Sequence, residues 1–151
     1  MKKITLSSKT VICGYPGIGK SYMRERNPLR VSDLDSGSYA WLSPSVRDPK
    51  FPQNYVDLVR RSNNIVLVSS HKDVRESLAN NRINFLVCYP KLSCKWTYLE
   101  RYRQQHQSEA FIRLMDIMWM EWVNQVKNDI RATQHIELPA GKFLSDVIDF
   151  G

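Results

Sequence analysis

The sequence predicts an α/β fold, a three-layer sandwich built around one five-stranded parallel sheet. Short runs of apolar and β-branched residues recur along the chain, and helical patterns separate them. Strand alternating with helix along a whole chain implies a parallel sheet with helices on both faces. The length of 151 residues, with 42% apolar and 25% charged side chains, fits a single globular domain over residues 1–151. These observations exclude a disordered chain, a fibre and a coiled coil.

The predicted strands are apolar on consecutive positions, which is typical of strands buried on both faces of a parallel sheet. In chain order they cover residues 9–13, 30–32, 65–69, 84–89 and 135–138. Helices are predicted over residues 20–26, 54–62, 72–80, 93–105, 108–131 and 143–150. Ligands of such sheets bind beyond the carboxyl ends of the strands, so we expect the functional residues there.

The longest predicted helix, over residues 108–131, carries an apolar stripe at helical spacing. The stripe consists of Phe111, Leu114, Met115, Met118, Trp122, Val126 and Ile130. Apolar residues at this spacing form the face with which a helix packs on a core. We therefore assign the stripe to the core and not to a binding site.

The sequence also predicts where the protein is found. No apolar run approaches the roughly 18 residues that a membrane span needs. Residues 1–8 contain no long apolar segment of the kind found in secretory signals. The three cysteines, Cys13, Cys88 and Cys94, lack metal-ligand spacing, and we expect them to be reduced thiols of the core. These features predict a cytoplasmic protein with no membrane partner.

The charge of the chain favours a polyanionic partner. The net charge of +7 arises from 22 basic and 15 acidic side chains. The excess lies in the first three quarters, because residues 114–151 carry three basic and six acidic side chains. A nucleotide, a nucleic acid or an anionic membrane surface would suit such a balance. Nucleic acid is compatible with this charge but is not required by it.

One segment satisfies the motif G-x-x-x-x-G-K-[ST] between an apolar strand and a helix: Gly14-Tyr15-Pro16-Gly17-Ile18-Gly19-Lys20-Ser21. We call residues 14–21 the phosphate loop. Its glycines allow successive backbone N–H groups to point at phosphate oxygens, and the following helix adds the positive end of its dipole. Lys20 is placed to reach the β and γ phosphates, and the Ser21 hydroxyl is placed to bind Mg²⁺. The motif therefore predicts ATP and Mg²⁺ as ligands.

Two carboxylates, Asp33 and Asp35, follow the second predicted strand. Alternation along an extended chain points both the same way, where they can contact Mg²⁺ or the acceptor. The third strand ends in Ser69, Ser70 and His71, so any carboxylate for Mg²⁺ must come from the aspartate pair. The alternative is that the pair caps a turn. A hydroxyl acceptor benefits from a carboxylate base and a phosphate acceptor needs none, which leaves both acceptors open.

The phosphate loop resembles the G-x-P-G-x-G-K loop of adenylate kinase and other nucleoside monophosphate kinases, with Pro16 as the characteristic detail. The chain is also similar to small phage-encoded P-loop proteins described as nucleotide-kinase-like. The segments that carry this resemblance are 31–36, 47–55, 68–75 and 143–148. The resemblance implies a P-loop NTPase fold of the nucleotide-kinase type, in the cytoplasm of a phage host. The chain departs from that family because no Asp-Gly follows the third strand. The acidic pair after the second strand resembles that of shikimate and gluconate kinases, where it serves the acceptor hydroxyl.

The same resemblance implies a lid helix that carries arginines, within residues 93–113. Arg101 and Arg103 are the candidates to neutralise the transferred phosphoryl group, and Arg113 is a weaker third. Because Arg101 and Arg103 are two positions apart, only one of them can face the phosphates on a regular helix. The resemblance also places Gly141, after the fifth strand, where the backbone approaches the adenine of ATP.

Monophosphate kinases hold the acceptor between the second and third strands, which corresponds to residues 39–61. There Tyr39 and Trp41 would stack on a base, and Arg47 would bind a phosphate with its planar fork. The alternative is a loop with surface arginines and half-buried aromatic rings. His71, at the end of the third strand, is a further candidate for contact with the substrate.

Three hypotheses follow. The first is ATP-dependent, Mg²⁺-requiring transfer of a phosphoryl group to a (deoxy)nucleoside monophosphate. The second keeps this reaction and changes the acceptor to a hydroxyl group on a nucleoside, a modified DNA base or a small metabolite. The third is a nucleotide-binding regulator or a nucleic-acid-binding protein without turnover, which the missing acid after the third strand and the net charge of +7 favour.

Overall fold

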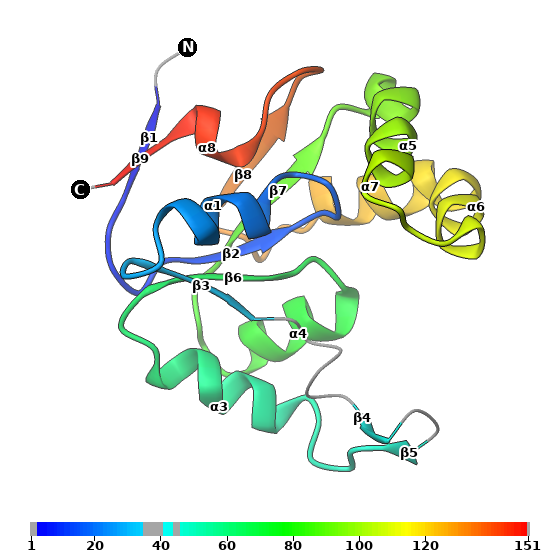
Figure 1. The fold of residues 1–151 in the computed structure, drawn as a ribbon. Helices are drawn as coiled ribbons and strands as arrows, with labels where there is room; N and C mark the ends of the chain where they lie inside the picture. Colours follow the sequence, from blue (N-terminus) through cyan, green and yellow to red (C-terminus); the bar gives the residue numbers. More distant parts are fainter. Residues whose placement is uncertain (1–2, 35–40, 44–45, 151) are drawn as a thin grey trace.

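The computed structural model describes residues 3–34, 41–43 and 46–150 of the protein. Its centre is a five-stranded sheet in the order β3-β6-β2-β7-β8, in which every neighbouring pair is parallel (Figure 1). The strands are β2 (Val11–Gly14), β3 (Val31–Leu34), β6 (Ile65–Ser69), β7 (Leu86–Pro90) and β8 (Gln134–Leu138). The predicted α/β class and the five-stranded parallel sheet are confirmed.

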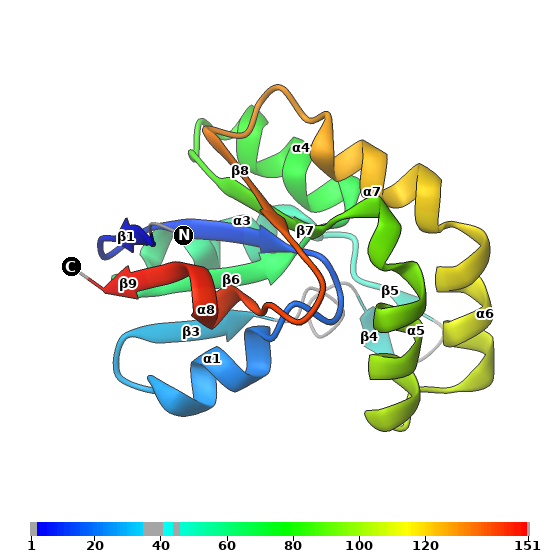
Figure 2. The ribbon, with the colours of Figure 1, turned by 90° about the horizontal axis from the view of Figure 1, so that it is seen from above.

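Helices cover both faces of this sheet. In Figure 1, α1 (Lys20–Arg26) and α8 (Leu144–Val147) lie above the sheet, and α3 (Gln53–Arg61) and α4 (Lys72–Asn80) lie below it. The remaining helices are the short 3-10 helix η1 (Leu92–Cys94), α5 (Lys95–Gln104), α6 (Glu109–Ile117) and α7 (Trp119–Lys127). Figure 2 shows α5 and α6 side by side beyond the carboxyl ends of β2 and β3. This is the end of a parallel sheet at which ligands bind.

The described part of the chain differs from the predicted elements in three places. The predicted helix 108–131 is two helices, because the backbone at Met118 (φ −93°, ψ 4°) ends α6 and begins α7. The predicted helix 143–150 is the single turn α8 followed by β9 (Ile148–Phe150), which pairs in parallel with β1 (Ile4–Leu6). A third small sheet joins β4 (Trp41–Ser43) to β5 (Val46–Arg47). Strands of two or three residues leave too little periodicity to be recognised.

The three cysteines lie in the core, as predicted. All are free and buried, and Cys13 and Cys88 have no exposed surface. Burial raises the pKa of the Cys13 thiol to about 12 and raises that of Cys88 above its ordinary value. These thiols are therefore protonated and inert at neutral pH. Among the described residues, no helix has both the length and the apolar character to cross a lipid bilayer.

Candidate functional site

The phosphate loop connects the central strand β2 to α1, and its shape depends on its glycines. Gly17 and Gly19 adopt φ values of +92° and +94°, a left-handed conformation that L side chains rarely adopt. A Cβ atom on Gly14 would lie 2.5 Å from Cδ1 of Ile18, whose side chain is fully buried under the loop. The first turn of α1 leaves its backbone N–H groups without partners inside the helix. The loop is therefore an open turn of backbone that can accept phosphate oxygens.

Lys20 and Ser21, the polar side chains of the loop, are both hydrogen-bonded within the protein. The ammonium group of Lys20 donates a hydrogen bond across the loop to the carbonyl of Gly14. The hydroxyl of Ser21 donates to Oδ2 of Asp33, at 3.3 Å, from the end of β3. This contact places the Asp33 carboxylate beside the loop. Asp35 lies outside the described residues.

The donor set at Ser21 and Asp33 fits Mg²⁺. A hydroxyl and a carboxylate are hard oxygen ligands, and Mg²⁺ in nucleotide sites takes one or two protein oxygens together with phosphates and waters. The described residues contain no group of three or more histidine, cysteine, aspartate or glutamate side chains that could hold a metal. The pair therefore suits a metal that arrives with phosphates better than one held by the protein alone.

Contacts from α5 and α8 hold the back of the phosphate loop. The hydroxyl of Tyr102 donates to the carbonyl of Pro16 at 2.7 Å, and Nη1 of Arg101 donates to that of Gly17 at 2.9 Å. The backbone N–H of Leu144, the first residue of α8, donates to the carbonyl of Ile18 at 2.8 Å. Burial raises the pKa of Tyr102 above its ordinary value, so its phenol remains protonated and a donor. Three successive carbonyls of the loop are thus held by distant segments.

Neither arginine of the predicted lid faces phosphates. Arg101 is buried, and its guanidinium lies 4.3 Å from the ring centroid of Tyr98 and 4.0 Å from that of Phe143. Arg103 is exposed and pairs with Glu100 at 3.3 Å. The structure places Arg101 behind the loop as a support and Arg103 on the surface. Arg113 is also exposed, on α6.

A cavity of about 1480 Å³ opens beside the phosphate loop, and we call it the main cavity. One side is the phosphate loop itself, together with Ser145 and Asp146. The other side is formed by residues 69–75 at the start of α4 and by side chains of α6 and α7. We call this second side the helical wall. The side chains that α6 and α7 contribute are Phe111, Leu114, Met115, Trp122, Gln125 and Val126.

The predicted core role of the apolar stripe over residues 108–131 is confirmed in part, because Met115 and Val126 belong to the buried core and Phe111 and Trp122 pack against it. The stripe also lines the main cavity, which was not predicted. Five stripe residues line the main cavity, and Leu114 is 47% exposed. Ile130, the last stripe residue, is 94% exposed. Helical spacing shows that one face is apolar, but it does not show whether that face meets a core or a cavity. The break at Met118 also turns α7 away from the line of α6, which no periodicity in the sequence indicates.

Of the other predicted site residues, His71 lies at the main cavity, Gly141 lies away from it, and the rest fall outside the described side chains. His71 lines the main cavity, and its backbone N–H donates to the hydroxyl of Ser69. Gly141 has a φ of +79°, a Cβ atom there would meet no atom of the described residues within 4 Å, and Gly141 does not line the cavity. Trp41 and Arg47 belong to β4 and β5, but their side chains lie outside the described residues, as does Tyr39.

Arg75, the buried arginine of the helical wall, has no role among the sequence-based predictions. It is 3% exposed and lines the main cavity from α4. Its Nε donates to the carbonyl of Ser70 at 2.8 Å, and Nη1 donates to Oδ2 of Asp129. The only signal in the sequence is an arginine beside the apolar positions Val74 and Leu78 of a helix. That signal does not reveal Asp129, which lies 54 positions away.

Comparisons with known proteins identify a similar fold but no family. No protein-family model matches the chain, and no curated protein sequence matches it. The structure of the Deinococcus radiodurans tunicamycin resistance protein is similar, with a TM-score of 0.57 and 16% identity, over 95% of this chain and 91% of that one. An uncharacterised protein of Eubacterium ventriosum has a TM-score of 0.47 and 14% identity, over 91% of this chain and 93% of the other, and this likeness is too low to support an argument.

These findings correct the family resemblance drawn from the sequence. A similar solved structure is that of a tunicamycin resistance protein, and no family model or curated protein supports the assignment to adenylate-kinase-like nucleoside monophosphate kinases. At 16% identity the likeness concerns the fold alone. A short loop and a few strings of residues were insufficient for a family assignment, since the same loop can be set in proteins of different function. The residues of the site must therefore be interpreted by their own geometry.

Proposed function

We propose that the protein catalyses ATP-dependent, Mg²⁺-requiring phosphoryl transfer on a sheet of the P-loop type. The observation that carries the proposal is the phosphate loop, with Ser21 hydrogen-bonded to Asp33, at the edge of the main cavity. Its volume of about 1480 Å³ exceeds the roughly 300–1,000 Å³ of pockets for one small ligand. The cavity is therefore large enough for a donor and an acceptor together. The proposal rests on these residues and not on the corrected resemblance.

Each residue of the loop has a role in this proposal. The backbone N–H groups and Lys20 bind the phosphates of ATP, and Lys20 exchanges its hydrogen bond with the Gly14 carbonyl for one with a phosphate oxygen. Ser21 and Asp33 hold Mg²⁺, which when bound supplies positive charge to the phosphate oxygens. Phosphoryl transfer depends mainly on positioning of the substrates and on neutralisation of the charge on the phosphates. A loop with a fixed backbone and a lysine side chain, Lys20, that can change its hydrogen-bond partner suits both needs.

The proposed acceptor is a (deoxy)nucleoside monophosphate. A second candidate is an acceptor with a hydroxyl group, on a nucleoside, a modified DNA base or a small metabolite. The apolar part of the helical wall favours this second candidate, because Phe111, Leu114 and Met115 offer no hydrogen-bond donor to a phosphate. Arg75 favours the first candidate, because its buried guanidinium lines the same cavity and suits a phosphate group.

An ADP-release assay with Mg²⁺, ATP and a panel of nucleoside monophosphates and nucleosides tests the proposal. We expect turnover with at least one acceptor, and a loss of at least about 100-fold in kcat in Lys20→Ala, because its charge is used in the transition state. The matched control is Lys127→Ala, an exposed lysine that pairs with Glu137 on the surface. Full activity of Lys20→Ala would contradict the assigned role. Binding of ATP without turnover on every acceptor would replace the proposal by the third hypothesis, and a steep dependence of DNA binding on salt would indicate its nucleic-acid form.

A further inference from the structure

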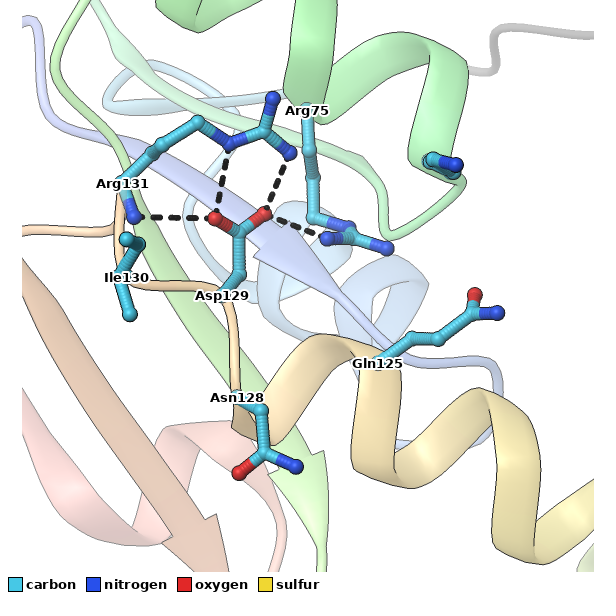
Figure 3. A pocket seen from close by; sticks show the side chains of 7 residues that line it. Arg75, Gln125, Asn128, Asp129, Ile130 and Arg131 are labelled. Carbon is cyan, nitrogen blue, oxygen red and sulfur yellow. Dashed lines mark hydrogen bonds and ion pairs between the residues drawn. The ribbon is translucent and has the colours of Figure 1, made fainter.

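Arg75 is held rigidly at the side of the main cavity. Its Nε donates to the carbonyl of Ser70. Its Nη1 donates to the carboxylate of Asp129, which follows α7 (Figure 3). Its side chain is 4% exposed and that of Asp129 is 2% exposed. A buried guanidinium fixed on two edges loses little further freedom when it binds a ligand.

Asp129 accepts hydrogen bonds from a second arginine besides Arg75. Its carboxylate also accepts hydrogen bonds from the backbone N–H, Nε and Nη2 of Arg131, each at 3.0 Å, as Figure 3 shows. Burial opposes ionisation of Asp129, but the hydrogen bonds from Arg131 and Arg75 lower its pKa to about 2. The guanidinium groups of Arg75 and Arg131 thus share the single carboxylate of Asp129, so two positive charges face one negative charge. The three side chains together carry a net charge of +1, and Glu76 on α4 offsets part of the charge of Arg131.

Arg75 lines the main cavity and has one amino group, Nη2, that is left for a ligand. Within the described residues, Nη2 of Arg75 donates no hydrogen bond, while Nε and Nη1 both do. Arg75 lines the main cavity and also a second cavity of about 270 Å³ that contains Arg131, whereas Arg131 lines only the second. Arg75 belongs to α4, which lies on the face of the sheet opposite α1, the helix that follows the phosphate loop (Figure 1).

We infer that Arg75 is an anion-binding side chain of the main cavity, and that it binds the phosphate group of a phosphorylated acceptor. The surplus positive charge of the Arg75, Asp129 and Arg131 group is balanced when an anion meets the open edge of the guanidinium. The planar fork of arginine suits phosphate oxygens. The identification of the anion as an acceptor rests on the proposed function. The binding of an anion by Arg75 does not.

Titration of inorganic phosphate into the protein, with and without saturating Mg²⁺ and a non-hydrolysable ATP analogue, tests this inference. The analogue fills the phosphate loop, so phosphate that still binds reports a separate site. Arg75→Gln removes the fork, and Asp129 keeps its hydrogen bonds from Arg131, so no buried carboxylate is left unpaired. The matched control is Arg61→Gln, an exposed arginine at the end of α3 that removes the same charge.

We expect the phosphate Kd to rise at least about tenfold in Arg75→Gln and less than about twofold in Arg61→Gln. The affinity for the ATP analogue stays within about twofold in both variants. If wild-type protein binds no phosphate, or if Arg75→Gln binds it as wild type does, the inference is overturned. An equal loss of affinity for the analogue would assign Arg75 to the donor and also overturn it.

A second variant, Arg75→Lys, covers the case in which Arg75→Gln does not fold. Lysine keeps the charge and loses the fork, and we expect a smaller rise in the phosphate Kd; an unchanged Kd would contradict binding by the fork. Absence of turnover in the ADP-release assay would remove the proposed function alone. The phosphate titration would still decide whether Arg75 binds an anion.

Discussion

The phosphate loop and the helical wall are held in place by different kinds of contact. In the loop the backbone itself is fixed, because the carbonyls of Pro16, Gly17 and Ile18 accept hydrogen bonds from α5 and α8. The helical wall is built mainly from side chains on α4, α6 and α7, although Ser69, Ser70 and His71 precede α4. The side chains from α6 and α7 are mostly apolar, and Arg75 is the buried charge of this wall.

This difference indicates that the phosphate loop and the helical wall contribute to binding in different ways. A site that binds phosphate with backbone N–H groups works only if the backbone keeps its conformation, which distant hydrogen bonds secure. A wall made of side chains can differ in shape and polarity without any change to the fold. We therefore expect substitutions behind the loop to affect stability and nucleotide affinity together. Substitutions in the helical wall should change ligand affinity without an equal change in stability.

Arg101→Ala should have the largest effect on the loop side. It removes the hydrogen bond to Gly17 and the stacking of the guanidinium between Tyr98 and Phe143. We expect a loss of about 2–4 kcal/mol in the free energy of unfolding, measured by urea denaturation, and weaker binding of the ATP analogue.

The control for this substitution is Arg103→Ala, two positions along the same helix. Arg103 is exposed and pairs only with Glu100 among the described residues, so the loss should stay within about 0.5 kcal/mol. A variant Arg101→Ala with normal stability and nucleotide affinity but a much lower kcat would contradict the supporting role. It would return Arg101 to the phosphates, as the sequence suggested.

The loop and its fold class could be predicted from the sequence because their signals are local. The motif of residues 14–21 is contiguous, and each buried strand is a continuous apolar run. The position of Arg101 could not be predicted, because its partner Gly17 lies 84 residues away in the chain. A helical pattern places Arg101 on a face of α5 but does not say what lies opposite that face.

The helical wall was missed for a related reason. The spacing of Phe111, Leu114 and Trp122 is that of an apolar helix face, and a core and an apolar cavity wall require the same residues. The structure gives the stripe both roles, since Met115 and Val126 are buried in the core and also line the main cavity. Likewise, β1 and β9 join opposite ends of the chain, and neither strand has a signal of its own.

For the helical wall, the lowered pKa of Asp129 should make the free energy of unfolding depend on pH in the acid range. Its pKa is lowered to about 2 in the folded protein, below the ordinary value near 4. The stabilisation is therefore complete above about pH 4 and disappears as the pH falls toward 2. It amounts to about 2 kcal/mol. Urea denaturation between pH 6 and pH 2.5 should show the wild type approaching Asp129→Asn over this range.

The comparison for this pH series is Asp149→Asn, which removes an exposed carboxylate paired with Lys3. Its free energy of unfolding should follow the wild type within about 0.5 kcal/mol at every pH. A difference between wild type and Asp129→Asn that stayed constant with pH would contradict the lowered pKa of Asp129. If the wild type instead lost stability relative to Asp129→Asn as the pH rose from 2.5 to 6, Asp129 would not be ionised in the folded protein. The net charge of +1 assigned to its group with Arg75 and Arg131 would then be wrong.

The smallest expected effect isolates one hydrogen bond of the loop. Tyr102→Phe keeps the ring and removes the hydroxyl that donates to the Pro16 carbonyl at 2.7 Å, and we expect a loss of about 1 kcal/mol in urea denaturation. Tyr15→Phe is the matched variant, because its hydroxyl is buried with no hydrogen-bond partner among the described residues. Removing an unpaired buried hydroxyl should leave stability unchanged or raise it. If both variants lost the same free energy of unfolding, the hydrogen bond to the Pro16 carbonyl would not account for the loss. The conformation of the phosphate loop would then depend on the packing of the tyrosine rings.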